Sequence, residues 1–568
     1  MLSLGFTAAF TAALVLAFPG PSNLFPRSPC AGNTPSTRSQ WCEYDSSTDY
    51  YTVAPDTGVV REYYFDLTDV VVAPDGVPRV GQAINGSIPG PTIVADWGDT
   101  VRVHMTNGLT RSSNGTSIHF HGIRQNFTNQ MDGVSSITQC PTPPGGTYTY
   151  EWKALQFGTT WYHSHFALQA WEGVFGGIVI NGPATADYDV DLGHVFLNDW
   201  DHETADALYA SAQSAGPPTL DTGLVNGTNV WGDDGSTGQT GKRFAVSFEA
   251  GTRYRLRLVN GAIDTSFKFM IDGHALTVMA NDLVPIVPYQ TEVLTINIGQ
   301  RYDVVVTADQ AAVAQDFWLR AIPQIACSDN ANPDDIKGIV YYGAAPGTPT
   351  TAAYNYTDSC DDEAASNLVP ALSKAVAAPT WSTNDAVAVG YNAANEFRWT
   401  LNSTTFVSNW SDPTLLEMTS ADSGFQPSEA VIQLPLTADD WVYFVVETSI
   451  PVGHPIHLHG FDFYVLAQGT GTYDGSTTAL QLANPPRRDT AFLPPNGYLV
   501  MAFQTDNPGA WLCHCHIGWH TSEGFAMQFV VREAEIGPLL DQTVLKETCS
   551  AWTAYAAALD VEQDDSGV

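Results

Sequence analysis

Residues 511–520 constrain this chain more than any other segment. They read Trp-Leu-Cys-His-Cys-His-Ile-Gly-Trp-His and place three imidazoles and a thiol within seven positions. Because successive side chains of a strand point to opposite faces, we expect His514 and His516 on one face and Cys515 on the other. One strand would then serve two metal sites. Cysteine with histidine favours copper, zinc or iron, and a short covalent bridge between two sites indicates electron transfer, which zinc does not support.

Histidine spacing elsewhere extends this pattern. Ten of the fourteen histidines lie in four short groups, and each group contains a His-x-His pair. A single pair fits a half-buried strand as well as it fits a metal site, whereas four pairs favour a metal cluster. The paired histidines are His119, His121, His163, His165, His457, His459, His514 and His516. Two more, His454 and His520, stand just outside the pairs.

The four remaining histidines are His104, His194, His202 and His274. None of them belongs to a pair, and we interpret all four as structural or surface residues.

Strand signals dominate the rest of the chain. Short runs of β-branched and aromatic residues occupy 92–95, 100–105, 253–258 and 441–446, between Gly, Pro, Asn and Asp turn signals. The strict alternation at 253–258 predicts a half-buried strand. These features predict an all-β chain of sandwiches or barrels. Residues 344–351 and 370–385 are predicted to be linkers.

The histidine motifs resemble the four copper-binding signatures of the multicopper oxidases, and the surrounding sequence is most similar to the ascomycete laccases. The similarity runs from about Tyr63 to the C-terminus and includes Ile-Asn-Gly-Ser-Ile-Pro-Gly-Pro at 84–91. It implies three cupredoxin-like domains, at about 50–184, 185–362 and 363–568. Two motifs fall in the first domain and two in the third, so the resemblance implies a shared metal cluster between them.

The resemblance implies four coppers and a role for each ligand. The type 1 copper is expected at His454, Cys515 and His520. The type 2 copper is expected at His119 and His457. One type 3 copper is expected at His121, His163 and His516, and the other at His165, His459 and His514. Phe525 occupies the axial position of the type 1 site, and because phenylalanine cannot ligate, we predict a high reduction potential.

Two carboxylates match acidic positions of the family. Asp132, in Met-Asp-Gly-Val, is expected to carry protons near the cluster, although an Asp-Gly pair is also an ordinary turn. Asp264 is expected to hold a phenolic hydroxyl near the type 1 site, and a solvated loop aspartate explains it equally well.

The function implied is that of a laccase, which oxidises small phenolic substrates by single electrons and reduces dioxygen to water. A ferroxidase or a bilirubin-type oxidase is the nearest alternative, although the axial phenylalanine disfavours the bilirubin type. From a different class, a copper-binding electron carrier would need no trinuclear cluster. Lignin degradation, plant phenols and pigment precursors all stay open as natural contexts.

Composition limits partners and compartment. The 568 residues carry 60 acidic and 23 basic side chains, and the net charge of −37 argues against nucleic acid and anionic membranes as partners. Residues 1–20 resemble a secretory signal peptide. Together with sequons at Asn85, Asn114, Asn126, Asn226, Asn355, Asn402 and Asn409, they predict a secreted, glycosylated protein, expected to be a monomer.

The cysteines and the tail complete the resemblance. The chain has eight cysteines, and their spacing resembles that of ascomycete laccases. The resemblance implies the bridges Cys30–Cys42, Cys140–Cys549 and Cys327–Cys360. With Cys515 as a copper ligand, Cys513 is left as a buried free thiol. The terminal Asp-Asp-Ser-Gly-Val, residues 564–568, resembles the C-terminal plug that ascomycete laccases insert above the trinuclear cluster. A frayed acidic terminus is the alternative.

Overall fold

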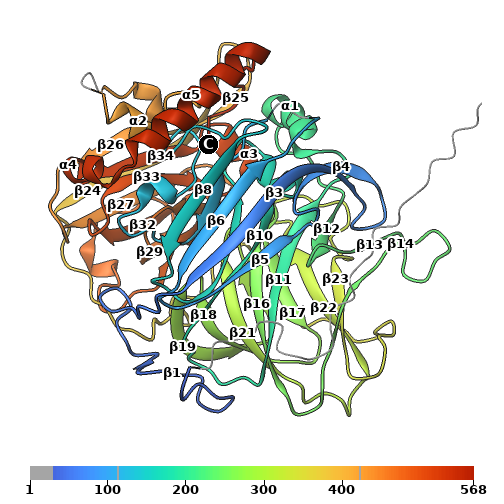
Figure 1. Ribbon diagram of the computed structural model, residues 1–568. Coiled ribbons are helices and arrows are strands. Elements are labelled where there is room, and N and C mark those ends of the chain that lie inside the picture. Colours follow the sequence, from blue (N-terminus) through green and yellow to red (C-terminus); the bar gives the residue numbers. More distant parts are fainter. Residues whose placement is uncertain (1–29, 112–113, 421–423) are drawn as a thin grey trace, which may run out of the picture.

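Three successive pairs of β-sheets build the molecule, as the computed structural model in Figure 1 shows. The structure describes residues 30–111, 114–420 and 424–568. The predicted signal peptide at 1–20 lies outside the described residues. The all-β prediction is confirmed. The domain limits stay a prediction, although the sheets fall between 60 and 181, 190 and 341, and 381 and 531.

The first pair of sheets packs around aromatic side chains that include Trp97, Phe120 and Trp152. One sheet has the order β4 (Arg79–Ile84), β3 (Val60–Val72), β6 (Thr100–Asn107), β8 (Thr147–Lys153). The other has the order β5 (Gly90–Asp96), β10 (Phe175–Asn181), β9 (Gly158–Ser164), β7 (Ile118–His121).

The second pair carries none of the paired histidines. Its larger sheet has the order β12 (Thr222–Val225), β11 (Val190–Trp200), β16 (Arg253–Asn260), β21 (Arg301–Thr307), β18 (Leu276–Asn281), β19 (Val284–Thr291). Its smaller sheet has the order β15 (Phe244–Ser247), β23 (Lys337–Tyr341), β22 (Asp316–Pro323), β17 (Phe267–Ile271), β20 (Leu294–Ile296).

The third pair carries the segment around Cys515. Its larger sheet has the order β25 (Phe397–Leu401), β24 (Trp381–Tyr391), β27 (Trp441–Thr448), β32 (Gly497–Gln504), β29 (Phe463–Thr470), β30 (Arg487–Arg488). Its smaller sheet has the order β26 (Val431–Leu434), β34 (Ala526–Val531), β33 (Gly509–Cys515), β28 (His454–Leu458), β31 (Thr490–Leu493). One continuous apolar core joins the second and third pairs.

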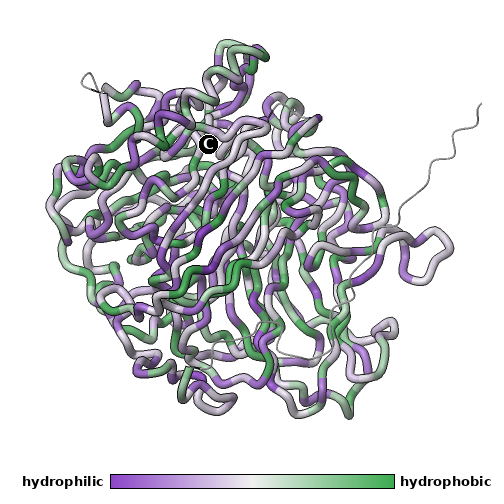
Figure 2. Tube along the Cα trace, in the orientation of Figure 1, coloured by the Kyte–Doolittle hydropathy of each residue, from purple (hydrophilic) through white to green (hydrophobic). Residues whose placement is uncertain are grey.

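All six sheets repeat one arrangement. Each contains a single parallel pair of strands, and its other neighbours are antiparallel. The parallel pairs are β3–β6, β5–β10, β11–β16, β15–β23, β24–β27 and β26–β34. The three sandwiches therefore share this pairing, although the sheets of the first have fewer strands than those of the other two. In Figure 2, apolar and polar residues are interspersed along the whole trace, as alternating strands require.

The four predicted strand runs all form, within β5, β6, β16 and β27. The prediction that the run at 253–258 is half-buried is wrong. Arg257 is fully buried and pairs with Asp191 at 2.7 Å, and Arg255 is buried beside Asp303. Arg257 lies against the first domain, where it also donates to the Gly158 carbonyl. Alternation revealed the strand, but it could not reveal that a second domain covers its polar face.

Helices and short strands fill the edges of the sheets. The helices are α1 (Ala205–Ala215), α2 (Thr414–Glu417), α3 (Gly518–Ser522), α4 (Glu533–Ile536) and α5 (Gln542–Leu559). Single 3-10 turns are η1 (Asn129–Met131), η2 (Gln169–Glu172), η3 (Pro427–Glu429), η4 (Thr477–Ala479) and η5 (Gly537–Leu539). Two small ribbons pair β1 (Gln40–Trp41) with β2 (Tyr44–Asp45), and β13 (Val230–Trp231) with β14 (Thr240–Gly241).

The disulfide prediction is confirmed for all three bridges, and Cys513 is a buried free thiol. The Cys140–Cys549 bridge ties α5 to the first domain. Of the predicted linkers, 344–351 forms no helix or strand, but 381–385 begins β24, so the second linker prediction is wrong there. Across the described ranges, none of the helices combines the length and apolar character needed to span a bilayer.

Candidate metal centres

Strand β33 ends at the first candidate centre. Cys515 Sγ lies 3.8 Å from His454 Nδ1 and 3.5 Å from His520 Nδ1, and the two nitrogens are 3.2 Å apart. His454 begins β28, the neighbour of β33, and His520 lies in α3 immediately after it. All three side chains are buried. Two imidazoles converging on one thiol form the donor set of a mononuclear copper site. We call His454, Cys515 and His520 the mononuclear set.

The histidines that flank Cys515 face a different group. His514 Nε2 lies 3.3 Å from His459 Nε2, and His516 Nε2 lies 3.3 Å from His121 Nδ1. The alternation predicted for this segment is therefore present. Cys515 and its two neighbours on the chain reach two separate donor groups.

The eight paired histidines form a single buried cluster, the eight-histidine cluster. They come from β7 and β9 of the first domain, from β28 and β33 of the third, and from the residues just after these strands. They form three groups, and within each group the ligand atoms lie within 4.8 Å of one another. The groups are His119 with His121 and His457, His121 with His163 and His516, and His165 with His459 and His514. The last two have the membership expected for the type 3 pair. The cluster lies between the first and third domains.

Backbone carbonyls set the proton positions on four of these rings. The bonds run from Nδ1 of His119 to Asp132 O (2.8 Å), of His163 to Ser164 O (2.9 Å), of His457 to Asp489 O (2.7 Å) and of His514 to Cys515 O (2.9 Å). Because a carbonyl only accepts, each Nδ1 carries the proton and each Nε2 keeps a lone pair. The Nε2 atoms of His119, His163 and His457 are buried without a hydrogen-bond partner. Unpartnered lone pairs that converge in a buried site fit metal ligation.

Burial keeps the donors in forms that suit a metal. It lowers the pKa of His454 to about 3 and that of His514 to about 4. It lowers the pKa values of six more cluster histidines well below the ordinary value: His121, His163, His165, His457, His459 and His516. Neutral imidazoles are ready to ligate. Burial raises the pKa of the Cys515 thiol well above its ordinary value, so a bound cation is needed to hold the thiolate.

Two carboxylates orient the cluster, and the sequence revealed only one of them. Asp132 Oδ2 bonds to His459 Nδ1 at 2.8 Å. Asp489 Oδ1 lies 3.2 Å from His121 Nε2, and Arg301 binds both oxygens of Asp489 at 2.6 and 2.5 Å. Burial raises the pKa of Asp489 and Arg301 opposes that rise. Asp489 belongs to a charged run, Arg-Arg-Asp-Thr at 487–490, that resembles an exposed loop in the sequence alone.

Comparison with known proteins now decides the family. Profiles described as "Multicopper oxidase" match residues 66–185, 192–344 and 407–535. The chain belongs to the multicopper oxidases. The chain is 46% identical to "Laccase-2" of Botryotinia fuckeliana over 99% of its length and 98% of that protein, and 47% identical to "Laccase-1" of the same fungus over 96% and 95%.

Solved structures agree with this. The laccase from Botrytis aclada superposes with a TM-score of 0.90 at 44% identity, over 95% of this chain and all of that one. Fet3p, a multicopper oxidase that functions in iron import, superposes with a TM-score of 0.75 at 26% identity, over 89% and 96%. The resemblance to ascomycete laccases and the cupredoxin-like fold are confirmed. This multicopper oxidase is a laccase that uses four coppers.

Aromatic side chains wall the mononuclear set of this laccase. The Phe525 ring lies 5.0 Å from the His454 ring, edge to face, where it presents carbon rather than a donor atom. Trp399 of β25 lies 4.3 Å from the His520 ring and 4.9 Å from the His454 ring. The sequence analysis predicted Phe525 but missed Trp399, because no motif links β25 to the copper-binding segments.

Asp264 lies in a loop that is anchored to the helix carrying His520. Asp199 accepts from the backbone amides of residues 263–265 at 2.8 to 2.9 Å, and Gly518 N donates to Ile263 O at 2.9 Å. Asp264 is 8% exposed, and burial raises its pKa to about 8. The solvated-loop interpretation therefore does not describe this side chain.

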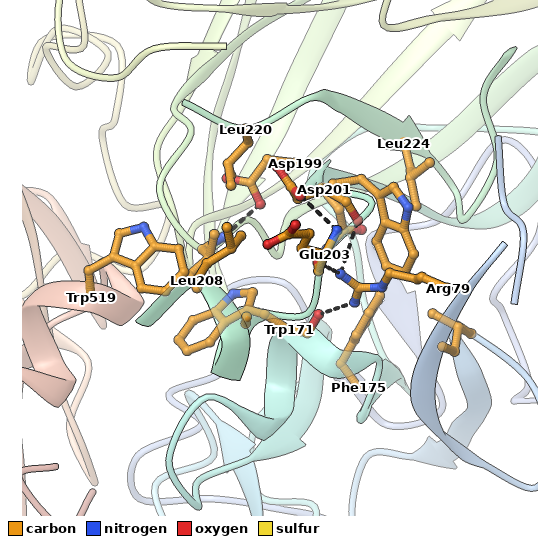
Figure 3. Close-up of a pocket in the computed structure, with 15 residues that line it drawn as sticks. Arg79, Trp171, Phe175, Asp199, Asp201, Glu203, Leu208, Leu220, Leu224 and Trp519 are labelled. Carbon is orange, nitrogen blue, oxygen red and sulfur yellow. Dashed lines mark hydrogen bonds between the residues drawn. The ribbon is translucent and has the colours of Figure 1, made fainter. Parts of the chain in front are cut away.

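A cavity lies beside this loop, at the meeting point of the three domains (Figure 3). Trp519 of α3 and Trp171 of η2 reach into it, and Arg79 closes one side by donating to the carbonyls of Trp171, Asp201 and Glu203. Trp519, which directly precedes His520, therefore lies where residues of all three domains meet.

The four unpaired histidines lie apart from both centres. His104 stacks on the exposed Tyr64, and His194 bonds to the Thr160 carbonyl. His202 bonds to Asp75 and Asp221, and His274 bonds to the Asp272 carbonyl and the Tyr342 hydroxyl.

The C-terminal tail of this laccase is buried. Ser136 Oγ and Trp410 Nε1 donate to Gly567 O at 2.8 and 3.2 Å. Val568 is 2% exposed and packs in an apolar cluster with Val134 and Phe166. Val134 follows Asp132 by two residues and Phe166 directly follows His165. The frayed-terminus alternative is therefore wrong.

Proposed function

We propose that this laccase oxidises phenolic donors one electron at a time at the mononuclear set and reduces dioxygen to water at the eight-histidine cluster. The observation that supports this most directly is the geometry at β33, where Cys515 faces one donor group and His514 and His516 face the other. When bound, copper supplies the one-electron redox steps and the binding of oxygen. The protein supplies a path of a few covalent bonds between the two groups.

The ligand roles follow the donor groups. His454, Cys515 and His520 would hold the type 1 copper, with Phe525 beside it. His119 and His457 would hold the type 2 copper. One type 3 copper would take His121, His163 and His516, and the other His165, His459 and His514. The unpartnered Nε2 atoms and the neutral rings support this assignment.

Two carboxylates would handle protons at opposite ends of the electron path. Asp132 is fully buried against His459, within reach of the cluster where water forms, and it can pass protons inward. Asp264, on the loop tied to α3, would accept the hydroxyl proton of a phenol as its electron leaves. Burial supports this second role, since a carboxylate in such a place binds a donor hydroxyl more strongly than in water.

We also infer that the protein is secreted as a monomer and that residues 564–568 act as a plug beside the cluster. The burial of Ser566 and Val568 supports the plug. Removing the last three residues should change the rate of oxygen reduction while leaving the type 1 absorption unchanged. A truncated protein with unaltered oxygen kinetics would contradict the plug.

One oxygen-electrode assay tests the whole proposal. With a simple phenol, ferrous iron and bilirubin as alternative donors, we expect the phenol to give the fastest steady oxygen uptake. Faster turnover of ferrous iron or bilirubin would instead favour a ferroxidase or a bilirubin-type oxidase. A single reduction of the copper without continuing uptake would indicate an electron carrier. Copper content and the blue absorption of the purified protein serve as the control for loading.

A further inference from the structure

Glu523 connects the helix of the mononuclear set to a strand of the neighbouring sheet. It caps α3, where its amide donates to Trp519 O at 2.9 Å. Its carbonyl accepts from Trp399 N at 3.0 Å, and its side-chain Oε2 accepts from Trp399 Nε1 at 3.1 Å. Glu523 is 2% exposed and Trp399 is 4% exposed. One residue thus makes two hydrogen bonds to the same tryptophan, three positions after the copper ligand His520.

Trp399 transmits this connection to the ligands. Its ring lies 4.3 Å from His520, 4.9 Å from His454 and 5.6 Å from Phe525, where it is stacked. A flat indole held at these distances limits how far either imidazole can rotate. The shell around a metal site also controls water access and therefore the reduction potential.

The side-chain bond can form whether Glu523 is charged or neutral, although it is stronger to the carboxylate. Burial raises the pKa of Glu523 to about 8, while the hydrogen bond from Trp399 and the charge of Arg398 oppose the rise and Asp264 adds to it. A neutral carboxylic acid still has an oxygen that accepts from an indole N–H, as the carboxylate does. The bond therefore survives protonation, which suits a structural link beside a redox centre.

Glu523 also forms part of a boundary with solvent. It lines a cleft together with Ser522, Arg398, Tyr391 and residues 563–566 of the tail. Trp399 lies on the inner side of Glu523, against the imidazoles. Loss of the side chain would release the indole beside this cleft, so its effect on the mononuclear set acts through Trp399.

We propose that Glu523 is a positioning residue that holds Trp399 against His520 and His454 and so sets the properties of the mononuclear set. This inference rests on one part of the proposed function, namely that His454, Cys515 and His520 bind the type 1 copper. It makes Glu523 and Trp399 one functional unit, although they belong to different elements and neither offers an atom to the copper.

Two substitutions at position 523 separate the hydrogen bond from the charge. Glu523→Gln keeps an acceptor oxygen of similar shape, so we expect the blue absorption, the type 1 reduction potential and the KM for phenols to stay within twofold of wild type. Glu523→Ala removes the acceptor, and we expect a shifted potential, an altered type 1 resonance spectrum and about a 10–100-fold loss in turnover. Equal effects of Gln and Ala would overturn the proposal, since charge and not the bond would then matter.

A double-mutant cycle with Trp399→Phe tests whether the two residues act as a unit. Phenylalanine keeps a ring but has no N–H, so adding Glu523→Ala to it should change the type 1 potential little further. Fully additive shifts would contradict the proposal. Glu535→Ala, at an exposed acid on α4, is the control for general effects of removing a glutamate.

A measurement on the copper-free protein keeps the test independent of the proposed function. Hydrogen exchange of the peptide containing β25 should be faster in Glu523→Ala than in wild type and in Glu523→Gln. Unchanged exchange together with an unchanged type 1 spectrum would refute the proposal. A wild-type protein that never develops blue absorption would refute the proposed function instead, while the exchange result would still report on the link to Trp399.

Discussion

The mononuclear set and the eight-histidine cluster differ in how far apart their parts lie in the chain. The mononuclear set comes entirely from the third domain, and two of its members, Cys515 and His520, are five residues apart. The cluster takes ligands from four segments in two domains, so it exists only when the first and third domains are docked. The first centre is therefore a property of one domain, and the second is a property of an interface.

Their surroundings differ as well. Carbon surrounds the mononuclear set, with Phe525 and Trp399 against its rings. Polar groups surround the cluster, where backbone carbonyls, Asp132 and Asp489 bind the outer ring nitrogens. A centre that passes only electrons benefits from exclusion of water, whereas a centre that makes water needs groups that hold protons. The predictions below test how independent the two regions are.

The largest effect is expected for Cys515→Ser. It removes the thiolate and with it both the blue colour and the path to the cluster, so oxidase activity should fall by about 10³-fold or more. Because the eight histidines are untouched, copper content should fall by one ion per chain. The matched control is Cys513→Ser, which changes a buried thiol on the same strand and should keep the colour. A copper loss greater than one would show that the two regions assemble together.

Asp489→Asn should damage the cluster while sparing the mononuclear set. It removes the charge that Arg301 binds and weakens the bond to His121, and loss of such a partner lowers metal affinity by about 10–100-fold. Chelator titration followed by copper counting and absorption spectroscopy would measure the loss of type 3 copper, which His121 would hold, against retention of the type 1 copper. Asp303→Asn breaks another buried arginine pair, with Arg255, away from the ligands and controls for general destabilisation. Parallel loss of both copper types would contradict the independence of the two regions.

Cys515 and His520 of the mononuclear set were predictable because they are close in the chain, whereas His454 was assigned through the family resemblance. Cys515, His520 and the alternation of β33 lie within one short segment, and period-two geometry fixed which side chains face which centre. The cluster was indicated by His-x-His pairs that recur four times, and its division into donor groups came from the family resemblance. The proton positions on the rings could not be predicted, because they depend on carbonyls such as Asp489 O that belong to other loops.

What escaped prediction was contact between distant segments. Asp489 is buried because Arg301, 188 positions earlier, binds it, and Trp399 meets the copper ligands only through tertiary packing. The same cause explains why the burial prediction for β16 was wrong, since its Arg257 is covered by the first domain. Local periodicity fixes which residues share a face of a strand, but the identity of the covering surface is not encoded within that strand.

Asp264→Asn tests the proposed proton acceptor beside the mononuclear set, and its effect on phenol turnover should depend on pH. Burial raises the pKa of Asp264 from 3.8 to about 8, so the carboxylate that accepts a phenol proton becomes more abundant as the pH rises toward that value. The variant should therefore lose most at about pH 8 and above, where the loss of one hydrogen bond to a charged group lowers phenol turnover about tenfold, and it should lose less in acid. Non-phenolic donors, which give up no proton, provide the control. Equal losses for both donor types would contradict the role.

The same substitution should change how stability depends on pH. A carboxyl whose pKa is raised on folding stabilises the fold in its protonated form, and this contribution is complete below the unfolded pKa and is lost as the pH rises through the folded pKa. Between about pH 4 and about pH 8, the melting temperature of the copper-loaded wild type should fall more than that of Asp264→Asn. A variant with the same slope as wild type would show that Asp264 ionises freely in the folded protein.

The smallest effect is expected for Phe525→Met. A thioether beside the mononuclear set would act as a weak axial ligand and stabilise the oxidised copper, so the type 1 reduction potential should fall. Since the driving force for oxidising phenols falls with it, turnover should decrease by only about twofold to threefold, with copper content and oxygen kinetics at the cluster unchanged. Phe525→Leu, which offers no donor atom, should keep the wild-type potential. If the methionine and leucine variants had the same reduction potential, Phe525 would affect the site through packing alone. The absence of an axial ligand would then not be the cause of a high potential.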